Sequence, residues 1–294
     1  MPEPVRDRWA EWVLDRSFGG DRTVRPGRLE MLTGVRDRVL DAAELQPGQT
    51  LLDVGAGDGL IAFGALERIG PEGRVIFSDI SEDLLEHCRT LADELAVTDR
   101  CEFVIASADD LDPLEDESVD VVTTRSVLIY LERERKRRAF EEFRRVLRAG
   151  GRLSIFEPIN SFGYPQPLGW FYGYDLSSIP ELVEKVLAVS SPAEESTLID
   201  FDERDLLVWA REAGFDPIHL EYEVDVKPGS WLTGPWASVL RTSGNPLAPP
   251  LGEALDEALT PEEREVFEAN LRPLVEANAG RAHSAVAYLS AAKP

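Results

Sequence analysis

The chain has 294 residues, 43% of them apolar, which is enough for one large domain with additions or for two smaller domains. With 22 glycines and 20 prolines, its composition excludes collagen-like, elastic and wholly disordered classes. The 31 basic and 55 acidic residues give a formal net charge of −24. The composition predicts a globular protein. Because a negative field repels phosphate backbones and anionic headgroups, we expect no binding to nucleic acid.

The cysteines and the apolar segments bear on the cellular compartment. Cys88 and Cys101 are too few for a disulfide framework or a thiolate metal site, which predicts a reducing environment. The first residues, Met1 to Arg8, are polar and do not resemble a signal peptide. No stretch reaches the roughly 18 consecutive apolar residues that a membrane span needs. The sequence predicts a cytoplasmic protein and leaves its oligomeric state open, with a homodimer as one option.

The predicted elements change character along the chain. Apolar residues at helical spacing, interrupted by Gly19-Gly20 and Pro26-Gly27, predict two or three helices over residues 1–45. Short apolar runs then predict strands at 50–54, 74–78, 101–105, 119–124, 152–156, 217–226 and 283–291. Amphipathic segments predict helices at 60–69, 81–95 with Ser81 as N-cap, 132–148 stopped by Gly150-Gly151, 202–213 and 261–277.

This alternation of strands and helices predicts a Rossmann-like, doubly wound α/β fold around a mostly parallel seven-stranded sheet. The ligand of such a sheet lies at the carboxyl ends of its strands. Two segments interrupt the alternation, and we expect them to form a helical lid over that edge together with the amino-terminal helices. The predicted divisions are a cap at 1–45, a core at 46–226 with an insertion at 159–200, a second insertion at 227–281 and the last core strand at 282–294.

Three glycines, Gly55, Gly57 and Gly59, follow the first predicted strand. Glycine has no Cβ to obstruct a ligand, and the next helix start supplies free N–H groups, so such a loop suits a nucleotide. The dinucleotide fingerprint is G-x-G-x-x-G, whereas position 60 is leucine and the spacing here is G-x-G-x-G. A tight turn between strand and helix that binds nothing would have the same local pattern.

Five ordered motifs within residues 50–158 together resemble the class I S-adenosylmethionine-dependent methyltransferases, in the ubiquinone/menaquinone-type small-molecule branch. The motifs are Asp53-Val54-Gly55-Ala56-Gly57-Asp58-Gly59, Phe77-Ser78-Asp79-Ile80, Ala108-Asp109, Val119-Asp120-Val121-Val122 with Arg125 to Leu131, and Val146 to Arg152. The resemblance implies S-adenosylmethionine as cofactor, with S-adenosylhomocysteine as product. It also implies an antiparallel last strand, for which 283–291 is the candidate.

The resemblance implies a role for each acid of these motifs. Asp53 would lie near the methionine amine, Asp79 would accept both ribose hydroxyls, and Asp109 would accept from the adenine amine. The simpler alternatives are that Asp53 binds loop N–H groups, that Asp79 is a solvated acid at a helix start, and that Asp109 belongs to a solvated acidic run. The predicted cofactor-binding residues are Asp53, Gly55, Ala56, Gly57, Asp79, Ile80, Ala108, Asp109 and Arg125.

Two residues after the fourth and fifth strands are the candidate catalytic residues. Glu157 has a carboxylate that suits a general base, with a structural role as the alternative. Tyr130 offers an aromatic face to a sulfonium cation, or packs in the core. Arg125 could equally meet an anionic acceptor or only support its loop.

The acceptor side is predicted from aromatic residues in the suspected lid, with the lid's own core as the alternative. The predicted substrate-binding residues are Trp9, Tyr164, Trp170 and Tyr172. His87, His219 and His283 lack the spacing of metal ligands, so no metal is expected.

These features predict methyl transfer from S-adenosylmethionine to an oxygen, nitrogen or carbon atom of a small molecule, by in-line displacement under an aromatic-rich lid. A nicotinamide-dependent oxidoreductase is one alternative, disfavoured by the glycine spacing and by the lack of a Tyr-x-x-x-Lys pair. A regulatory protein that binds the cofactor without catalysis is another. Cys88 and Cys101 do not match the places of arsenic-binding cysteines in arsenite methyltransferases, and no Asn-Pro-Pro-Tyr indicates amino-methylation of nucleobases.

Overall fold

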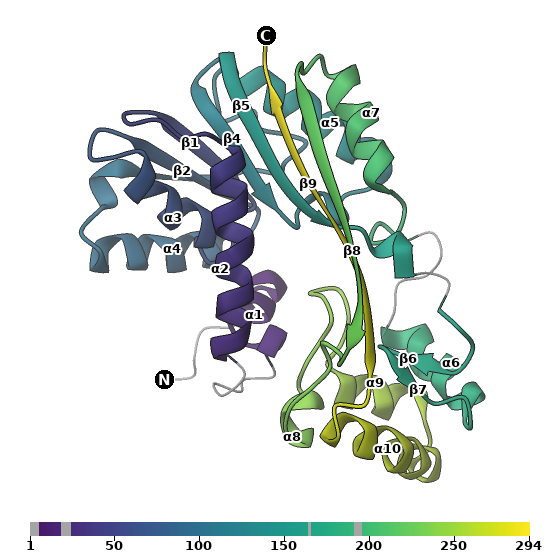
Figure 1. The fold of residues 1–294 in the computed structure, drawn as a ribbon. Coiled ribbons are helices and arrows are strands. Elements are labelled where there is room, and N and C mark those ends of the chain that lie inside the picture. Colours follow the sequence, from purple (N-terminus) through teal and green to yellow (C-terminus); the bar gives the residue numbers. More distant parts are fainter. Residues whose placement is uncertain (1–5, 19–24, 164–165, 191–195) are drawn as a thin grey trace. The chain divides into compact units, whose positions relative to one another are not determined.

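The computed structural model describes residues 6–18, 25–163, 166–190 and 196–294 (Figure 1). Contacts divide the chain into two compact units, each assembled from three separate stretches. The sheet unit comprises residues 29–159, 200–223 and 286–294. The helical unit comprises the described residues of 1–28, 160–199 and 224–285.

A seven-stranded sheet has the order β3-β2-β1-β4-β5-β9-β8 (Figure 1). Its strands are β1 (Thr50–Val54), β2 (Arg74–Asp79), β3 (Cys101–Ile105), β4 (Val119–Arg125), β5 (Leu147–Pro158), β8 (Ile218–Pro228) and β9 (Arg281–Ala292). The first five are parallel to their neighbours, and β9 runs antiparallel to β5. The predicted fold and the antiparallel last strand are confirmed. The strand order reverses at β1, since β2 and β3 lie on one side of it and β4 and β5 on the other. In folds of this type a crevice forms at that point, between the carboxyl ends of β1 and β4.

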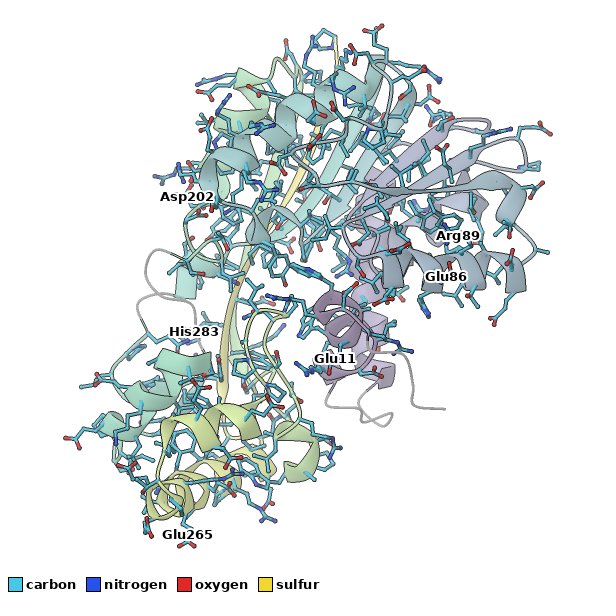
Figure 2. All side chains as sticks on the ribbon, turned by 180° about the vertical axis from the view of Figure 1, so that it is seen from behind. Glu11, Glu86, Arg89, Asp202, Glu265 and His283 are labelled. Atoms are coloured by element: carbon cyan, nitrogen blue, oxygen red, sulfur yellow. The ribbon has the colours of Figure 1, made fainter. Side chains whose placement is uncertain are left out.

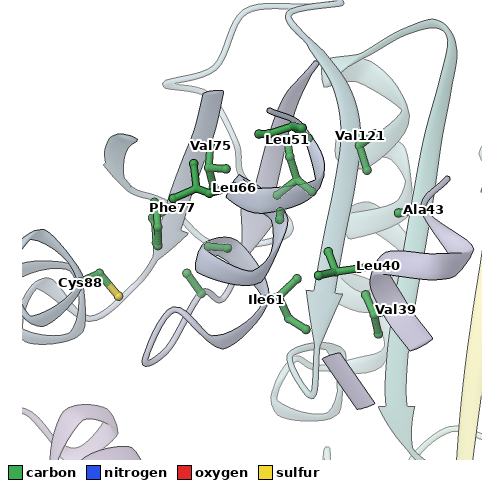
Figure 3. Close-up of a cluster of buried hydrophobic side chains, with 14 of the residues drawn as sticks. Val39, Leu40, Ala43, Leu51, Ile61, Leu66, Val75, Phe77, Cys88 and Val121 are labelled. Atoms are coloured by element: carbon green, nitrogen blue, oxygen red, sulfur yellow. The ribbon is translucent and has the colours of Figure 1, made fainter. Parts of the chain in front are cut away.

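Three helices cover one face of this sheet. They are α2 (Arg25–Ala42), α3 (Leu60–Arg68) and α4 (Glu82–Glu94). Figure 3 shows their buried side chains, among them Leu40, Ile61 and Cys88, in one cluster with Leu51 and Phe77 of the strands. The predicted N-cap of α4 is confirmed, since the Ser81 hydroxyl accepts from the Leu84 N–H at 3.1 Å. The helix α3 begins at Leu60, directly after Gly59 of the glycine loop, and its apolar face is buried against the strands.

Helices α5 (Arg133–Val146) and α7 (Glu203–Glu212) lie on the other face (Figure 1). The rings of Phe140 and Trp209 join them, with centroids 6.2 Å apart. The end of α5 differs from its prediction, because the helix stops at Val146 and the buried Leu147 already belongs to β5. Gly150, with a φ of 76°, turns within the strand and donates its N–H to the Lys293 carbonyl. Pairing with the last strand therefore extends β5 through the two glycines.

The helical unit has a hydrophobic core of its own. Its buried side chains include Phe171, Tyr174, Val183, Leu255 and Phe267. The predicted helix near 261–277 is confirmed as α10, with Thr260 in a capping box at its start. The elements are α1 (Arg8–Leu14), η1 (Arg16–Phe18), η4 (Asn160–Gly163), β6 (Trp170–Phe171), β7 (Tyr174–Asp175), α6 (Pro180–Ser190), α8 (Trp236–Val239), α9 (Leu251–Ala258) and α10 (Pro261–Glu276).

Charged side chains cover the outside of both units (Figure 2). Part of the negative charge is paired, as where Arg89 binds Glu86 one turn away on α4. Asp202 caps α7 by accepting from the backbone N–H groups of Arg204 and Asp205. Across the described parts of the chain, every helix is too short or too polar to span a bilayer.

Candidate active site

The glycine loop after β1 adopts a backbone that other residues rarely take. Gly55, Gly57 and Gly59 have φ values of 68°, 58° and 80°. A Cβ at Gly55 would overlap Cγ2 of Val127, and one at Gly59 would overlap the Phe63 ring. At Gly57 the nearest described heavy atom to such a Cβ is the Gly55 oxygen, at 3.9 Å. A Cβ on the middle glycine would therefore make only an ordinary van der Waals contact, whereas a Cβ on either outer glycine would overlap a packed side chain.

Asp79, at the end of β2, connects that strand to the loop. Its Oδ2 accepts from the Gly57 N–H and its Oδ1 from the Ser81 N–H, both at 2.9 Å. These donors orient a carboxylate whose residue is only 7% exposed. The following Ile80 is 50% exposed, so an apolar side chain stands in the open beside the buried acid.

The side chain of Asp53, in β1, is hydrogen-bonded to the neighbouring strand β4. Its Oδ1 accepts from the Thr123 hydroxyl of β4 at 2.8 Å, and the residue is 2% exposed. Burial raises the pKa of Asp53 to about 7, against the opposing effects of Thr123 and of the positive charge of Arg125. Arg125, which ends β4, is thereby placed near the acid. Nearby, the Oδ1 of Asp58 in the glycine loop is buried with no hydrogen-bond partner in the described structure.

Asp109, after β3, is held by a guanidinium group. Its Oδ2 accepts from Nε of Arg135 at 2.7 Å, and its Oδ1 accepts from Nη2 of Arg135 at 2.8 Å and also from the Ser107 hydroxyl. Burial would raise the pKa of Asp109, but these bonds to Arg135 and Ser107 outweigh it and lower the pKa. The preceding Ala108 is buried. Asp109 therefore remains ionised, in a fixed orientation.

Glu157, near the end of β5, is fully buried and faces a turn of backbone. Its Oε1 accepts from the N–H groups of Val127 and Leu128 at 2.9 Å, and its Oε2 from that of Ile129 at 3.3 Å. Burial raises its pKa to about 7, against these three bonds and the charge of Lys136. The carboxylate holds the 3-10 helix η3 (Leu128–Tyr130), which carries Tyr130. These contacts favour the structural role over that of a base.

Comparison with known proteins bears on this site. Residues 51–151 match the family described as "Methyltransferase domain". A ubiquinone/menaquinone biosynthesis C-methyltransferase from Salmonella arizonae is 30% identical over 187 residues, which cover 61% of this chain and 71% of that protein. The chain belongs to the class I S-adenosylmethionine-dependent methyltransferases.

Two further proteins resemble this methyltransferase, one in sequence and one in fold. An arsenite methyltransferase from Halobacterium salinarum is 31% identical over 180 residues, which cover 60% of this chain but only 40% of that protein. A geranyl diphosphate C-methyltransferase from Streptomyces coelicolor A3(2) has a TM-score of 0.53 at 18% identity, with 95% of this chain and 88% of that one covered. The second likeness shows the fold.

The aromatic residues predicted for the acceptor of the methyltransferase belong to the helical unit. Trp9 lies in α1, Trp170 in β6 and Tyr172 between β6 and β7. Tyr172 packs against Trp231 with ring centroids 4.8 Å apart and donates its hydroxyl to the Ser190 carbonyl at 2.8 Å. Both partners lie within the same unit, as expected for a core residue. Tyr164 lies outside the described residues.

The structure brings together the candidate residues of the methyltransferase that lie at the carboxyl ends of β1, β2, β4 and β5. Contacts connect the glycine loop to Asp79 and to Val127, and Val127 to Glu157. Sequence reasoning missed Arg135 and Lys136, at the start of α5. The sequence has a run of charged residues there, but its pattern does not show that Lys136 is buried or that Arg135 pairs with Asp109.

Proposed function

We propose that the protein transfers the methyl group of S-adenosylmethionine to a small-molecule acceptor by in-line displacement. The observation that carries this proposal is that no described side chain from outside the loop lies within 4 Å of a Cβ position on Gly57, whose N–H is fixed by Asp79. A backbone that no side chain obstructs, next to oriented carboxylates, suits a nucleoside. The buried, unpartnered Oδ1 of Asp58 in the same loop also fits a site that receives a polar ligand.

The residues present fit an adenosyl ligand in the manner that the sequence predicts. Asp79 would accept from the two ribose hydroxyls, with Ile80 against the base. Asp109 and Ala108 would lie beside the adenine, and Asp53 would lie near the methionine amine. Gly55, Ala56 and Gly57 would line the part of the cofactor between these two ends. When bound, S-adenosylmethionine supplies a methyl group activated by a sulfonium, so the protein has to orient the reactants and exclude water.

Tyr130 and Glu157 have separate parts in this proposal. Tyr130, in η3 at the end of β4, would present its aromatic face to the sulfonium. The general-base role of Glu157 remains the alternative to a positioning role. Its three backbone contacts support positioning, because both carboxylate oxygens already accept from the N–H groups of residues 127, 128 and 129.

The acceptor is proposed to be a small organic molecule. The similar proteins are named for methylation in ubiquinone/menaquinone biosynthesis, of arsenite and of geranyl diphosphate. Arsenite is disfavoured here, because the chain has two cysteines and burial raises the pKa of both thiols. We further propose that the segments 1–45, 159–200 and 227–281 choose the acceptor, through Trp9, Tyr164 and Trp170. The contacts of Tyr172 with Trp231 and Ser190 support a core role for that residue instead.

Two measurements test this function. Calorimetry on the full chain should show S-adenosylhomocysteine binding and no NAD(P) binding, and the reverse result would indicate the oxidoreductase alternative. Incubation with a metabolite extract and cofactor labelled in its methyl group should then transfer label to a small molecule. Cofactor binding with no transfer across broad extracts would favour the regulatory alternative.

A further inference from the structure

We propose that Lys136 is a positioning residue that, together with Glu157, clamps the turn 127–131 against the glycine loop. No side chain of this clamp other than Glu157 was expected from the sequence. The inference rests on the proposed function for its consequence, which is that the clamp sets affinity for the cofactor. The clamp itself rests on contacts within the sheet unit and can be measured without any ligand.

The carboxylate of Glu157 holds the amino end of the turn. Three successive backbone N–H groups, of Val127, Leu128 and Ile129, donate to its two oxygens. Such a set stabilises the charged form of a carboxyl group, which is otherwise costly to bury. Glu157, which lies 28 to 30 residues further along the chain than its three donors, therefore fixes the amino end of the turn.

The ammonium of Lys136 holds the carboxyl end of the same turn. Its Nζ donates to the Leu131 carbonyl at 2.7 Å and forms an ion pair with Asp200. Its side chain is completely buried, and the Nζ lies 4.8 Å from the centre of the Phe201 ring. A lysine is rarely buried in this way without a partner, because the ion loses its hydration. The turn therefore lies between a buried anion at one end and a buried cation at the other.

Val127 transmits the position of this turn to the glycine loop. Its Cγ2 occupies the space that a Cβ on Gly55 would need. The backbone of the loop is thus in close contact with the first residue that Glu157 holds. Tyr130, the proposed sulfonium contact, lies on the same turn between the two charged anchors. A loosened turn would displace both the wall of the loop and this aromatic ring.

The charges in the clamp are coupled. Burial raises the pKa of Glu157 to about 7, and the ammonium of Lys136 counteracts that rise. Burial lowers the pKa of Lys136, while Asp200 and Glu157 raise it and Arg133 lowers it. Removal of the Lys136 charge should therefore raise the pKa of Glu157 further. Since a protonated carboxyl is a poorer acceptor for three N–H groups, the turn should loosen at a higher pH than in the wild type.

The direct test is a pH titration of the backbone amide resonances of residues 127, 128 and 129 in the full chain. In the wild type these resonances should shift together with a midpoint near pH 7. In Lys136→Met the midpoint should move to a higher pH, because the positive charge that opposes the rise is removed. The matched control is Arg137→Met, the next residue of α5, whose guanidinium pairs with the exposed Glu134 and Glu141. It should leave the midpoint unchanged.

Two further variants complete the test. Lys136→Gln keeps a donor for the Leu131 carbonyl and removes only the charge, so it serves if Lys136→Met does not fold. Glu157→Gln should abolish the titration of these three amides. A titration that persists in this variant would belong to another group, such as Asp53, and would overturn the assignment to the clamp. An unchanged midpoint in both folded Lys136 variants would also overturn it.

Calorimetry with S-adenosylhomocysteine then measures the consequence. Lys136→Met should weaken binding about tenfold, which lies within the range of coupling energies between residues of one network. The double variant with Glu157→Gln should bind no worse than the weaker single variant, because both act through one turn. Independent, additive losses would contradict the clamp. A wild type that titrates as expected but binds no S-adenosylhomocysteine would overturn the proposed function and leave the clamp standing.

Discussion

The backbone N–H of Gly57 donates a hydrogen bond of 2.9 Å to the carboxylate of Asp79, 22 residues further along the chain. This bond joins the middle of the glycine loop to the end of the neighbouring strand. The second carboxylate oxygen of Asp79 accepts from the N–H of Ser81, so donors on both oxygens orient this side chain. The same carboxylate that would receive the ribose therefore also sets the position of the loop beside it.

Asp79→Ala should weaken S-adenosylhomocysteine binding by roughly 1–3 kcal/mol, because it leaves both the ribose hydroxyls and the Gly57 N–H without their acceptor. Calorimetry measures the change. Asp99→Ala, at an exposed acid in η2 (Thr98–Arg100), is the control and should bind as the wild type does. Unchanged affinity in Asp79→Ala would remove this residue from the cofactor site.

Gly55→Ala should destabilise the fold and weaken cofactor binding, because the new Cβ would overlap Val127 at a φ of 68°. A loss of roughly 1–3 kcal/mol is expected from strain and overpacking. Val127→Ala added to Gly55→Ala should recover the part due to overlap but not the part due to φ. Chemical denaturation of both variants measures the two parts. No recovery in the double variant would show that Val127 does not limit the loop.

Asp53→Asn should change the pH dependence of stability. The folded pKa of Asp53 is raised to about 7 from 3.8, so between these values the folded state holds a proton that the unfolded state has lost. Stability from this group is therefore present at low pH and lost as pH rises toward 7, by on the order of 1–4 kcal/mol. Relative to the wild type, Asp53→Asn should gain stability between pH 5 and pH 8.

Urea denaturation at the two pH values measures this gain. Glu157 has the same sign, since its pKa is also raised to about 7, so the wild-type slope should be reduced and not abolished. The exposed Asp112→Asn is the matched control and should show no such difference. An equal stability difference between Asp53→Asn and the wild type at both pH values would contradict the raised pKa.

Glu157→Gln separates a base from a positioning residue. The amide keeps one acceptor oxygen for three backbone donors, so a positioning role predicts weaker S-adenosylhomocysteine binding together with lower turnover. A base would lose turnover while cofactor affinity stayed the same. Calorimetry and a methyl-transfer assay on the same preparation distinguish the two outcomes. Unaltered turnover would exclude both roles.

Local sequence determined the elements of the sheet unit. β1 and β3 have the predicted bounds, because a short apolar run between turn residues is a signal contained within a few neighbouring positions. Ser81 was recognisable as an N-cap for the same reason, since it binds an N–H three residues away. The glycine spacing and the ordered motifs that follow it were likewise sufficient to predict the methyltransferase family, because each motif is a short stretch of neighbouring residues.

Only the tertiary structure decided which charged groups meet and which aromatic residues are core. Asp109 meets Arg135 across 26 residues, Lys136 meets Asp200 across 64, and Trp12 donates to the Ser243 carbonyl across 231. Composition and periodicity describe a residue together with its neighbours in the chain. The partner of a buried charge depends on which elements pack together, and that depends on the hydrophobic core of the whole unit.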